Sequence, residues 1–391
     1  MHSSPAGLLT IAVILMLGAC SAPADERIAG RGLETAGPGL TLVDSVVLVE
    51  ADTAYVGRPV ALEVTLDGSL LVSDGFAKTV YRFGRDGQLA SRYGGPGGGP
   101  GEFRAPTLLS ADSLDVAVVD PAAGRLTVFD LESGRVLTQV PLLGRTGDVR
   151  LSGDQAWFGL LRPGDEASFA NVRLRLRPGS MSDSVLETRF LGAVPSAYHA
   201  SARMREVLPL TSVDRYGAGF VSGYAGLDVL VVHDDRGWPT RVLDIPKRLR
   251  RGVPSDIVQQ LAQQIPLEKM ASLASTLAKV RSLDSARVAL VHMDLTMDAM
   301  TAGATAYISV VRPSSMDACV DAPVIVAGDG VPPITFQGDT LYVLDQYVPS
   351  DAGAPRSVTV IRRYRIDTSD CEWVPARQVS AVEIGFPISD R

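Results

Sequence analysis

The sequence has little positive charge outside arginine and few aromatic side chains. Only four of its 37 basic residues are lysines, aromatic residues make up 6%, and the formal net charge is −7. A protein that binds a phosphate backbone needs surplus positive charge, so this balance argues against nucleic acid as a partner. Walker loops, G-x-S-x-G elbows, zinc-binding cysteine patterns and dinucleotide fingerprints are also missing. The sequence therefore predicts no cofactor and no metal.

Long hydrophobic runs are missing as well. The apolar run Leu8–Leu17 is too short to span a bilayer but suits the core of a signal peptide. The Leu17-Gly18-Ala19-Cys20 stretch that completes it resembles the lipobox of bacterial lipoproteins. This resemblance implies cleavage after residues 1–19, a lipid on Cys20 and, because Ser21 rather than Asp follows, sorting to the outer membrane, facing the periplasm. The alternative is an ordinary small-residue cleavage site with an incidental cysteine.

Residues 20–39 are rich in Gly, Pro and Ala and are expected to form a flexible tether with a reach of roughly 25 Å. We expect residues 40–391 to form a single domain.

Two stretches of that domain share one pattern of short apolar runs separated by polar turns. Asp67–Gly94 and Ser113–Leu137 superpose after a shift of 46 residues, which aligns Asp74 with Asp120. The pattern is typical of consecutive antiparallel hairpins. Four-stranded units that recur every 40–50 residues or so are typical of a β-propeller.

The connection between these units is YGGPGGGPGEFRAP, Tyr93–Pro106. Neither helix nor strand continues through so much Gly and Pro, so the segment must cross from one blade to the next. Its G-P-G-E-F-x-x-P wording, followed by a strand that ends in V-x-D, resembles NHL-repeat propellers and the six-bladed propeller lipoproteins of bacteria. The resemblance implies an envelope protein with this fold.

The sequence thus predicts an all-β, six-bladed β-propeller whose first strand, within Leu40–Asp52, closes the ring against the last blade. Seven blades remain possible if that strand begins a blade of its own. The fifth unit is the least regular and could lack a strand. The six units are expected at about 59–94, 105–141, 147–192, 206–245, 286–328 and 331–383.

A helical insertion is expected between blades four and five, at about 254–283. Ser255 can cap a first helix and Pro266 can begin a second. Both apolar stripes are expected to pack against the domain beneath. The stripes consist of Ile257, Val258, Leu261 and Ile265, then Leu267, Met270, Ala274 and Leu277.

The connections separate into two groups. If the strands of a blade are called a to d from the axis outward, the a–b and c–d turns are tight, such as Asp67-Gly68 and Asp86-Gly87. We call their side the short-turn face. The opposite, long-loop face carries the b–c and d–a connections, and binding residues concentrate on such loops. Its long connections are 93–106, 162–170, 193–206, the helical insertion and 347–355.

Arginine and aromatic side chains on this face suit recognition of a sugar, a carboxylate or a peptide. The alternative is a set of solvated loop charges. The candidate ligand-binding residues are Arg162, Asp165, Glu166, Tyr198, His199, Arg203 and Arg205.

Other chemistry-bearing residues favour structural roles. His199, His233 and His292 lack a metal-ligand spacing. Propeller lactonases bind Ca²⁺ through Glu, Asp and Asn, and this chain has one asparagine, Asn171. Asp74 and its counterparts Asp120 and Asp345 are expected to fix turns.

Cys319 and Cys371 are expected to begin equivalent strands of neighbouring blades. An oxidising compartment and the even count favour a disulfide, whereas the spacing of blades at the rim opposes it. The sequence leaves the pairing open.

The predicted function is that of an envelope-anchored binding or scaffold module for a protein, peptide or glycan, with the membrane reached through the lipid. The alternative is a periplasmic enzyme of lyase, lactonase or glycan-hydrolase type. That enzyme would need Asp, Glu or His side chains to converge at one end of the axis.

Overall fold

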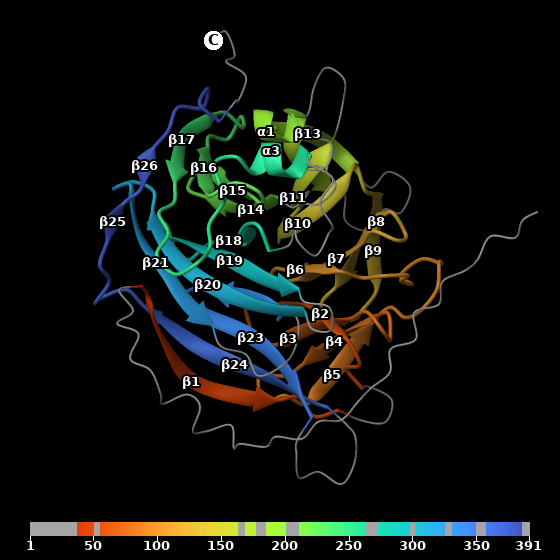
Figure 1. Ribbon diagram of the computed structural model, residues 1–391. Coiled ribbons are helices and arrows are strands. Elements are labelled where there is room, and N and C mark those ends of the chain that lie inside the picture. The colour runs from red at the N-terminus through yellow and green to blue at the C-terminus, as the bar shows by residue number, and fades with distance from the viewer. Residues whose placement is uncertain are drawn as a thin grey trace, which may run out of the picture.

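The computed structural model describes residues 37–50, 55–162, 169–176, 185–200, 211–262, 272–297, 302–324, 331–348 and 357–384. Six antiparallel sheets surround a common axis (Figure 1). The predicted six-bladed β-propeller is confirmed.

The first three blades each contain four strands in sequence order, from the axis outward. Blade one comprises β2 (Pro59–Val64), β3 (Leu70–Asp74), β4 (Thr79–Phe83) and β5 (Leu89–Tyr93). Blade two comprises β6 (Leu108–Ala111), β7 (Asp115–Asp120), β8 (Arg125–Asp130) and β9 (Val136–Pro141). Blade three comprises β10 (Arg145–Ser152), β11 (Gln155–Arg162), β12 (Phe169–Leu176) and β13 (Val185–Ala193).

The next blades follow the same plan, with short helices in the connections before and after blade four. These helices are α1 (Ser196–Ala200) and α3 (Ile257–Ala262). Blade four comprises β14 (Thr211–Tyr216), β15 (Gly219–Tyr224), β16 (Val229–His233) and β17 (Pro239–Asp244). Blade five comprises β18 (Thr276–Ser282), β19 (Val288–Met297), β20 (Ala302–Arg312) and β21 (Asp317–Val324).

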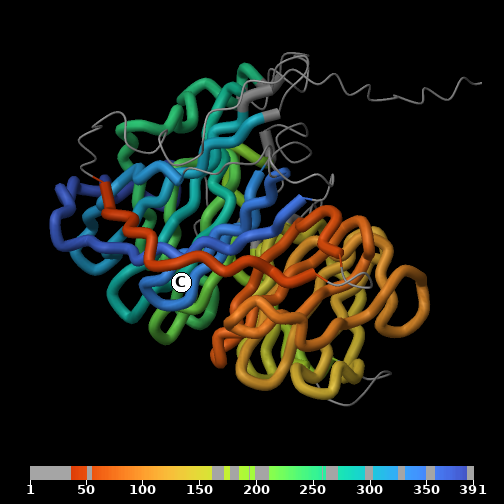
Figure 2. Tube along the Cα trace, turned by 90° about the horizontal axis from the view of Figure 1, so that it is seen from below, coloured from red at the N-terminus to blue at the C-terminus, as the bar shows by residue number. Residues whose placement is uncertain are grey.

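Blade six joins the two ends of the domain. Its inner strands are β22 (Ile334–Gln337), β23 (Thr340–Tyr347) and β24 (Val358–Asp367), and its outermost strand is β1 (Gly39–Val47). β1 pairs antiparallel with β24, from Gly39 opposite Asp367 to Val47 opposite Val360. Figure 2 shows the two strands side by side. The first strand therefore closes blade six, which rules out a seventh blade built on it.

Blade five corrects the predicted insertion. The first helix is present as α3, but residues 276–282 form strand β18 instead of the end of a second helix. The predicted start of that second helix at Pro266 lies outside the described residues. Leu277 and Val280 are buried in the core between blades four and five. Lys279 lies between these two residues and Arg281 follows them. The resulting mixture of apolar and basic residues resembles the pattern of an amphipathic helix. Blade five is therefore complete, with β18 as the strand that its predicted range omits.

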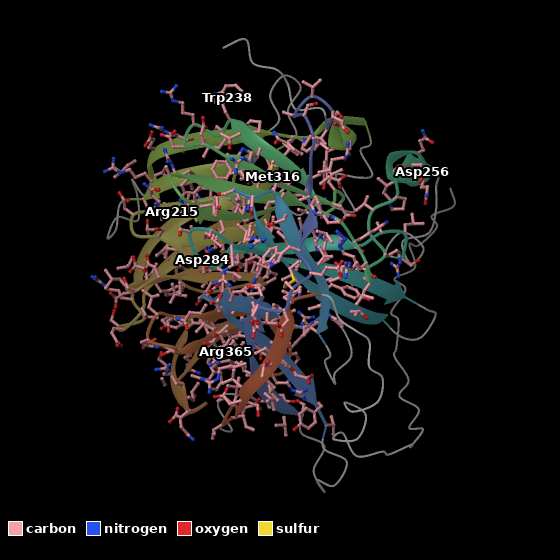
Figure 3. The ribbon with its side chains drawn as sticks, turned by 90° about the vertical axis from the view of Figure 1, so that its left-hand side faces the viewer. Arg215, Trp238, Asp256, Asp284, Met316 and Arg365 are labelled. Carbon is pink, nitrogen blue, oxygen red and sulfur yellow. A yellow bond between two sulfur atoms is a disulfide. The ribbon has the colours of Figure 1, made fainter. Side chains whose placement is uncertain are left out.

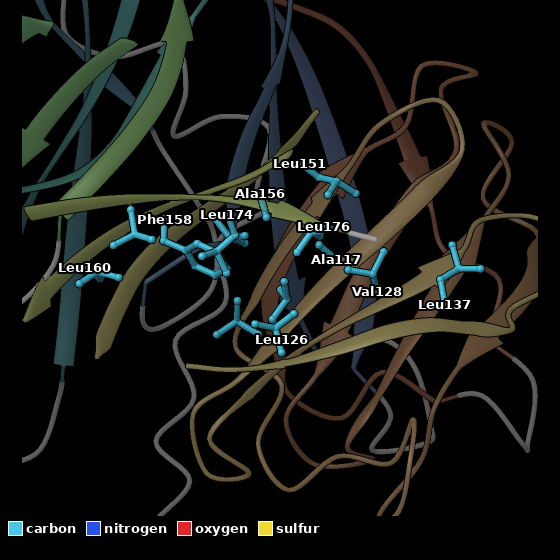
Figure 4. Packing of buried hydrophobic residues seen from close by; sticks show 14 residues of the cluster. Ala117, Leu126, Val128, Leu137, Leu151, Ala156, Phe158, Leu160, Leu174 and Leu176 are labelled. Carbon is cyan, nitrogen blue, oxygen red and sulfur yellow. The ribbon is translucent and has the colours of Figure 1, made fainter. Parts of the chain in front are cut away.

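The blades adhere through apolar side chains that interdigitate between neighbouring sheets. Between blades two and three, Leu126, Phe158 and Leu174 belong to one buried cluster (Figure 4). Full burial of each such side chain contributes about 1.5–3 kcal/mol relative to exposure. The ring thus places six rigid inner strands around the axis.

A C-terminal strap follows β24 along the outer edges of two blades. β25 (Val374–Pro375) pairs with β21 of blade five, and β26 (Arg377–Gln378) pairs with β17 of blade four. A disulfide joins Cys319 to Cys371, with their Cα atoms 5.8 Å apart. Contrary to expectation, Cys371 begins no blade strand: it lies in the strap between β24 and β25, while Cys319 lies within β21.

Candidate binding face

The two faces of the ring differ in how the chain turns. Gly68 and Gly87 adopt positive φ values of 81° and 82° in the tight a–b and c–d turns of blade one. The b–c and d–a connections, including α1 and α3, emerge on the opposite side. Figure 3 shows Arg215 and Asp284, which adjoin a–b turns, on the side opposite Asp256, which precedes α3. The described chain therefore separates into the expected short-turn and long-loop faces.

The long glycine-rich crossing has a fixed conformation. Phe103 is fully buried and contacts Phe129 with their ring centroids 5.8 Å apart. The Arg125 guanidinium donates to the carbonyls of Gly99 and Glu102, each at 2.6 Å. The GEF part of the motif thus anchors the crossing through its phenylalanine.

The aspartate at the end of strand b holds the crossing that enters its own blade. Asp74 accepts hydrogen bonds from the amides of Gly57 and Arg58 at 2.7 and 3.1 Å. In the next blade, Asp120 accepts from the amides of Arg104 and Ala105 at 2.7 and 3.0 Å. Each carboxylate also accepts from the following b–c turn, which confirms the predicted turn-fixing role of Asp74 and Asp120. The third predicted residue, Asp345, forms an ion pair with Arg362 at 3.1 Å. Arg58 and Arg104 remain exposed.

Tyr198 differs from the role predicted for it. Its side chain is fully buried, lies 6.2 Å from the Tyr224 ring and accepts a hydrogen bond from the amide of Gly226 at 3.0 Å. Burial raises the pKa of Tyr198 above its ordinary value. Tyr198 therefore packs α1 against blade four and is not available to a ligand.

Two further members of the predicted ligand-binding set are placed by their backbone alone. Arg162 ends β11, and the backbone of His199 lies in α1 on the long-loop face. The other four predicted residues lie outside the described residues, namely Asp165, Glu166, Arg203 and Arg205.

The two histidines described in the blades are buried, His233 in blade four and His292 in blade five. His233 lies in the third strand of blade four and stacks on Phe220, with Nε2 2.8 Å from the Ser222 hydroxyl. Burial lowers the pKa of His233 to about 4, against a smaller opposing effect of the hydrogen bond to Gly237. Burial and the nearby Arg250 charge hold the pKa of His292 well below its ordinary value. Both imidazoles are therefore neutral at pH 7.

The axis contains a network of charged side chains that the sequence interpretation missed. Arg150 of blade three lies 3.3 Å from Glu63 of blade one and 3.2 Å from Asp214 of blade four. Arg281 of blade five forms a two-point contact with Asp148 of blade three, at 2.6 and 2.8 Å. Successive side chains of the inner strands point alternately toward the blade core and toward the axis. A sequence interpretation that looks for binding residues in loops therefore does not find the axial ones.

These axial charges neutralise one another. Burial alone would raise the pKa of Asp148, but the charge and hydrogen bonds of Arg281 lower it below its ordinary value. Burial lowers the pKa of Lys279 to about 8, and its ammonium donates to the Ile334 carbonyl at 2.5 Å. The network therefore satisfies its carboxylates with protein cations. Among the described residues, no group of three or more His, Cys, Asp or Glu side chains is arranged to hold a metal ion.

A second buried polar cluster lies at the boundary of blades four and five. Asp321 accepts from the amides of Arg248, Leu249 and Arg250, at 2.5 to 3.4 Å. The Arg250 side chain is fully buried, and its Nε lies 3.4 Å from Asp321. The arrangement fixes the basic stretch Lys247–Arg251, a local excess of positive charge that the overall composition conceals.

No protein-family model and no curated protein sequence matches this chain. Solved structures do match it. A putative exported protein from Bacteroides fragilis has a TM-score of 0.55 at 12% identity, over 85% of this chain and 96% of its own. A member of the DUF4221 family from Bacteroides vulgatus has a TM-score of 0.56 at 12% identity, over 86% of this chain and 100% of its own. Fold and comparisons thus define a six-bladed β-propeller.

No helix among the described residues is long and apolar enough to cross a membrane.

Proposed function

We propose that the chain is an envelope lipoprotein of the NHL-like propeller type whose long-loop face binds a protein, peptide or glycan. Cys20 carries the lipid, residues 20–39 form the tether, and the ring faces the periplasm from the outer membrane. The lipobox-like stretch supports the anchor. The exported protein with the same fold supports passage into the envelope.

The observation that carries the binding role is the contrast between axis and face. At the axis, Asp148 and Arg281 use one another's charge. On the long-loop face, Asp74 and Asp120 bind backbone amides and leave Arg58 and Arg104 exposed. A rigid scaffold that presents exposed cations suits binding more than it suits acid–base chemistry.

The anchor is tested by Cys20→Ser in the full-length protein. We expect the wild-type chain to lose residues 1–19, to incorporate labelled palmitate and to fractionate with membranes, because a lipid-modified cysteine is its only proposed anchor. The variant should lose the label and become extractable. A variant that still fractionates with membranes, together with a wild type that takes up no label, contradicts the anchor.

The binding face is tested by affinity capture from envelope fractions. Arg203→Glu reverses a charge on a predicted long-loop connection, and Arg236→Glu reverses an exposed one in a short c–d turn. We expect one defined envelope partner or glycan to be recovered by the wild type and by Arg236→Glu, but not by Arg203→Glu. If Arg203→Glu still recovered the partner and Arg236→Glu did not, binding would lie on the short-turn face.

A further inference from the structure

Large apolar side chains are exposed on the long-loop face where blades six and one meet. Phe76, between β3 and β4, is 78% exposed, and Val348, just after β23, is 63% exposed. Tyr55, which precedes β2, and Tyr347 are each 38% exposed. Tyr347 ends β23, and the other three lie in d–a or b–c connections of these two blades. We call these residues together with Arg58 the blade-one patch.

Hydrogen bonds and close packing hold the patch together. The Tyr55 hydroxyl lies 2.8 Å from the Ser357 hydroxyl at the start of the blade-six strand β24. The Gln346 amide group donates to the Val56 carbonyl at 2.7 Å, which joins the end of β23 to the strand that enters blade one. A Cβ at Gly57 would lie 3.3 Å from the Phe76 ring. The exposed groups are therefore preorganised.

The patch also carries positive charge for which the described residues supply no ion-pair partner. The Asp74 carboxylate accepts from four amides, those of Gly57, Arg58, Phe76 and Ala77. These amides use the hydrogen-bonding capacity of Asp74. Among the described residues, the Arg58 guanidinium donates only to the Gly75 carbonyl, at 3.3 Å. Within the part of the chain that the structure describes, no carboxylate forms an ion pair with Arg58 or Lys78.

We propose that the blade-one patch binds a protein segment that carries a carboxylate next to an apolar side chain. Arg58 would take the carboxylate in a charge-assisted, two-point hydrogen bond. Phe76, Tyr55 and Val348 would cover the apolar neighbour. A glycan is less suited, because the Asp74 carboxylate, which could accept from sugar hydroxyls, is already used by backbone amides. The proposal rests on the proposed function and names the ligand class for its face.

An array of ten-residue peptides tests the patch with the full-length protein purified in detergent. The array pairs peptides that contain Leu-Asp or Phe-Glu with the same peptides carrying Leu-Asn or Phe-Gln, and includes neutral and uronic-acid oligosaccharides. The variants are Arg58→Glu and Phe76→Ala. Their controls on the short-turn face are Arg236→Glu and Leu66→Ala, since Leu66 is 73% exposed in a tight turn.

We expect peptides with an acidic and an apolar residue to bind at least about tenfold more tightly than their amide counterparts, because the carboxylate adds one charge-assisted contact. Arg58→Glu and Phe76→Ala should abolish this preference, while both controls retain it and all variants keep the wild-type melting temperature. Equal binding of amide peptides, binding of oligosaccharides alone, or no peptide binding contradicts the proposal. Loss of peptide binding in Arg203→Glu but not in Arg58→Glu would contradict the proposed patch but would still be consistent with binding on the long-loop face. Loss of peptide binding in Arg236→Glu alone would contradict both the patch and the proposed function of the long-loop face.

Discussion

The arginines at the axis and those on the long-loop face differ in how nearby carboxylates contact them. Arg281 contacts both carboxylate oxygens of Asp148, and Arg150 lies between Glu63 and Asp214. Asp74 and Asp120 accept hydrogen bonds from the backbone amides of Arg58 and Arg104, not from their guanidinium groups. In the first region the carboxylates neutralise the cations. In the second they position the backbone and, among the described residues, form no ion pair with the exposed cations.

The difference shows which charges of this propeller stabilise it and which can meet a ligand. A buried ion pair balances a large desolvation cost, so the loss of one partner is severe. An exposed arginine is solvated in either state and contributes little to stability. The predictions below start at the axis and end on the long-loop face.

The largest effect is expected from Asp148→Ala. It leaves the buried Arg281 guanidinium without its carboxylate, which should lower the free energy of unfolding by about 3–5 kcal/mol. Urea denaturation followed by tryptophan fluorescence measures the change. The double variant Asp148→Leu/Arg281→Met should recover most of the loss, because it removes both charges. Equal loss in the single and double variants would show that the ion pair itself is not what matters.

The Cys319–Cys371 disulfide is expected to rank second. It closes a separation of 52 residues at the rim, so its reduction should cost about 2–4 kcal/mol through the entropy of the unfolded chain. Cys371→Ser, compared with wild type in the presence and absence of reductant, measures this. Thiol titration of the unfolded protein should find these two cysteines protected until reductant is added. Reductant-independent stability of the wild type would argue against a stabilising bridge.

Asp74→Ala should cost about 1–3 kcal/mol, since four amides lose their acceptor. Asp120→Ala removes the equivalent clamp in blade two and should cost a similar amount. Only Asp74→Ala should weaken peptide binding, because Asp120 holds Arg104 and not Arg58. Peptide affinities of the two variants at equal fractions folded decide this. Equal loss of binding in both would indicate a general effect of loosened crossings.

A smaller effect of opposite sign is expected at Asp115. Burial, with Asp112 and Asp130 nearby, raises the pKa of Asp115 to about 6. An acid with a raised pKa stabilises the fold below its unfolded pKa of about 4 and loses that contribution as the pH rises through 6. Asp115→Asn should therefore be more stable than wild type by about 0.5–1 kcal/mol at pH 7, discounted for partial exposure. The two proteins should converge near pH 4, and a constant difference across this range would contradict the shift.

The smallest change in stability is expected from Arg58→Glu. An exposed arginine without a carboxylate partner should alter the free energy of unfolding by less than about 0.5 kcal/mol. The same urea denaturation measures it. A loss comparable to that of Asp148→Ala would mean that Arg58 has a structural partner after all.

Much of the fold follows from the sequence where turns are tight. Asp67-Gly68 and Asp86-Gly87 mark the hairpins of blade one, and Asp74 and Asp120 identify the repeat. Ring closure by the first strand also follows, because an uncovered last blade would leave an exposed edge. Gly and Asp have specific backbone roles at these positions, so a single sequence is informative there.

The inner strand of blade five and the axial network do not follow from the sequence. In β18, Lys279 and Arg281 face the axis while Leu277 and Val280 face the core, and this mixture resembles a helix surface. A charge that is neutralised across the ring has no local signature, since Asp148 and Arg281 are 133 residues apart. The binding candidate Tyr198 fails for a related reason: the position of a tyrosine near a loop does not reveal that its ring is buried.

The central claim is that the axis stabilises the ring and the long-loop face binds. Peptide affinity, at equal fractions folded, and unfolding free energy measured in parallel for Asp148→Ala and Arg58→Glu test it most directly. The axial variant should keep wild-type affinity while its stability changes, and Arg58→Glu should keep its stability while it loses about tenfold or more in affinity. Loss of affinity in the axial variant with unchanged binding by Arg58→Glu would place the ligand at the axis and contradict the claim.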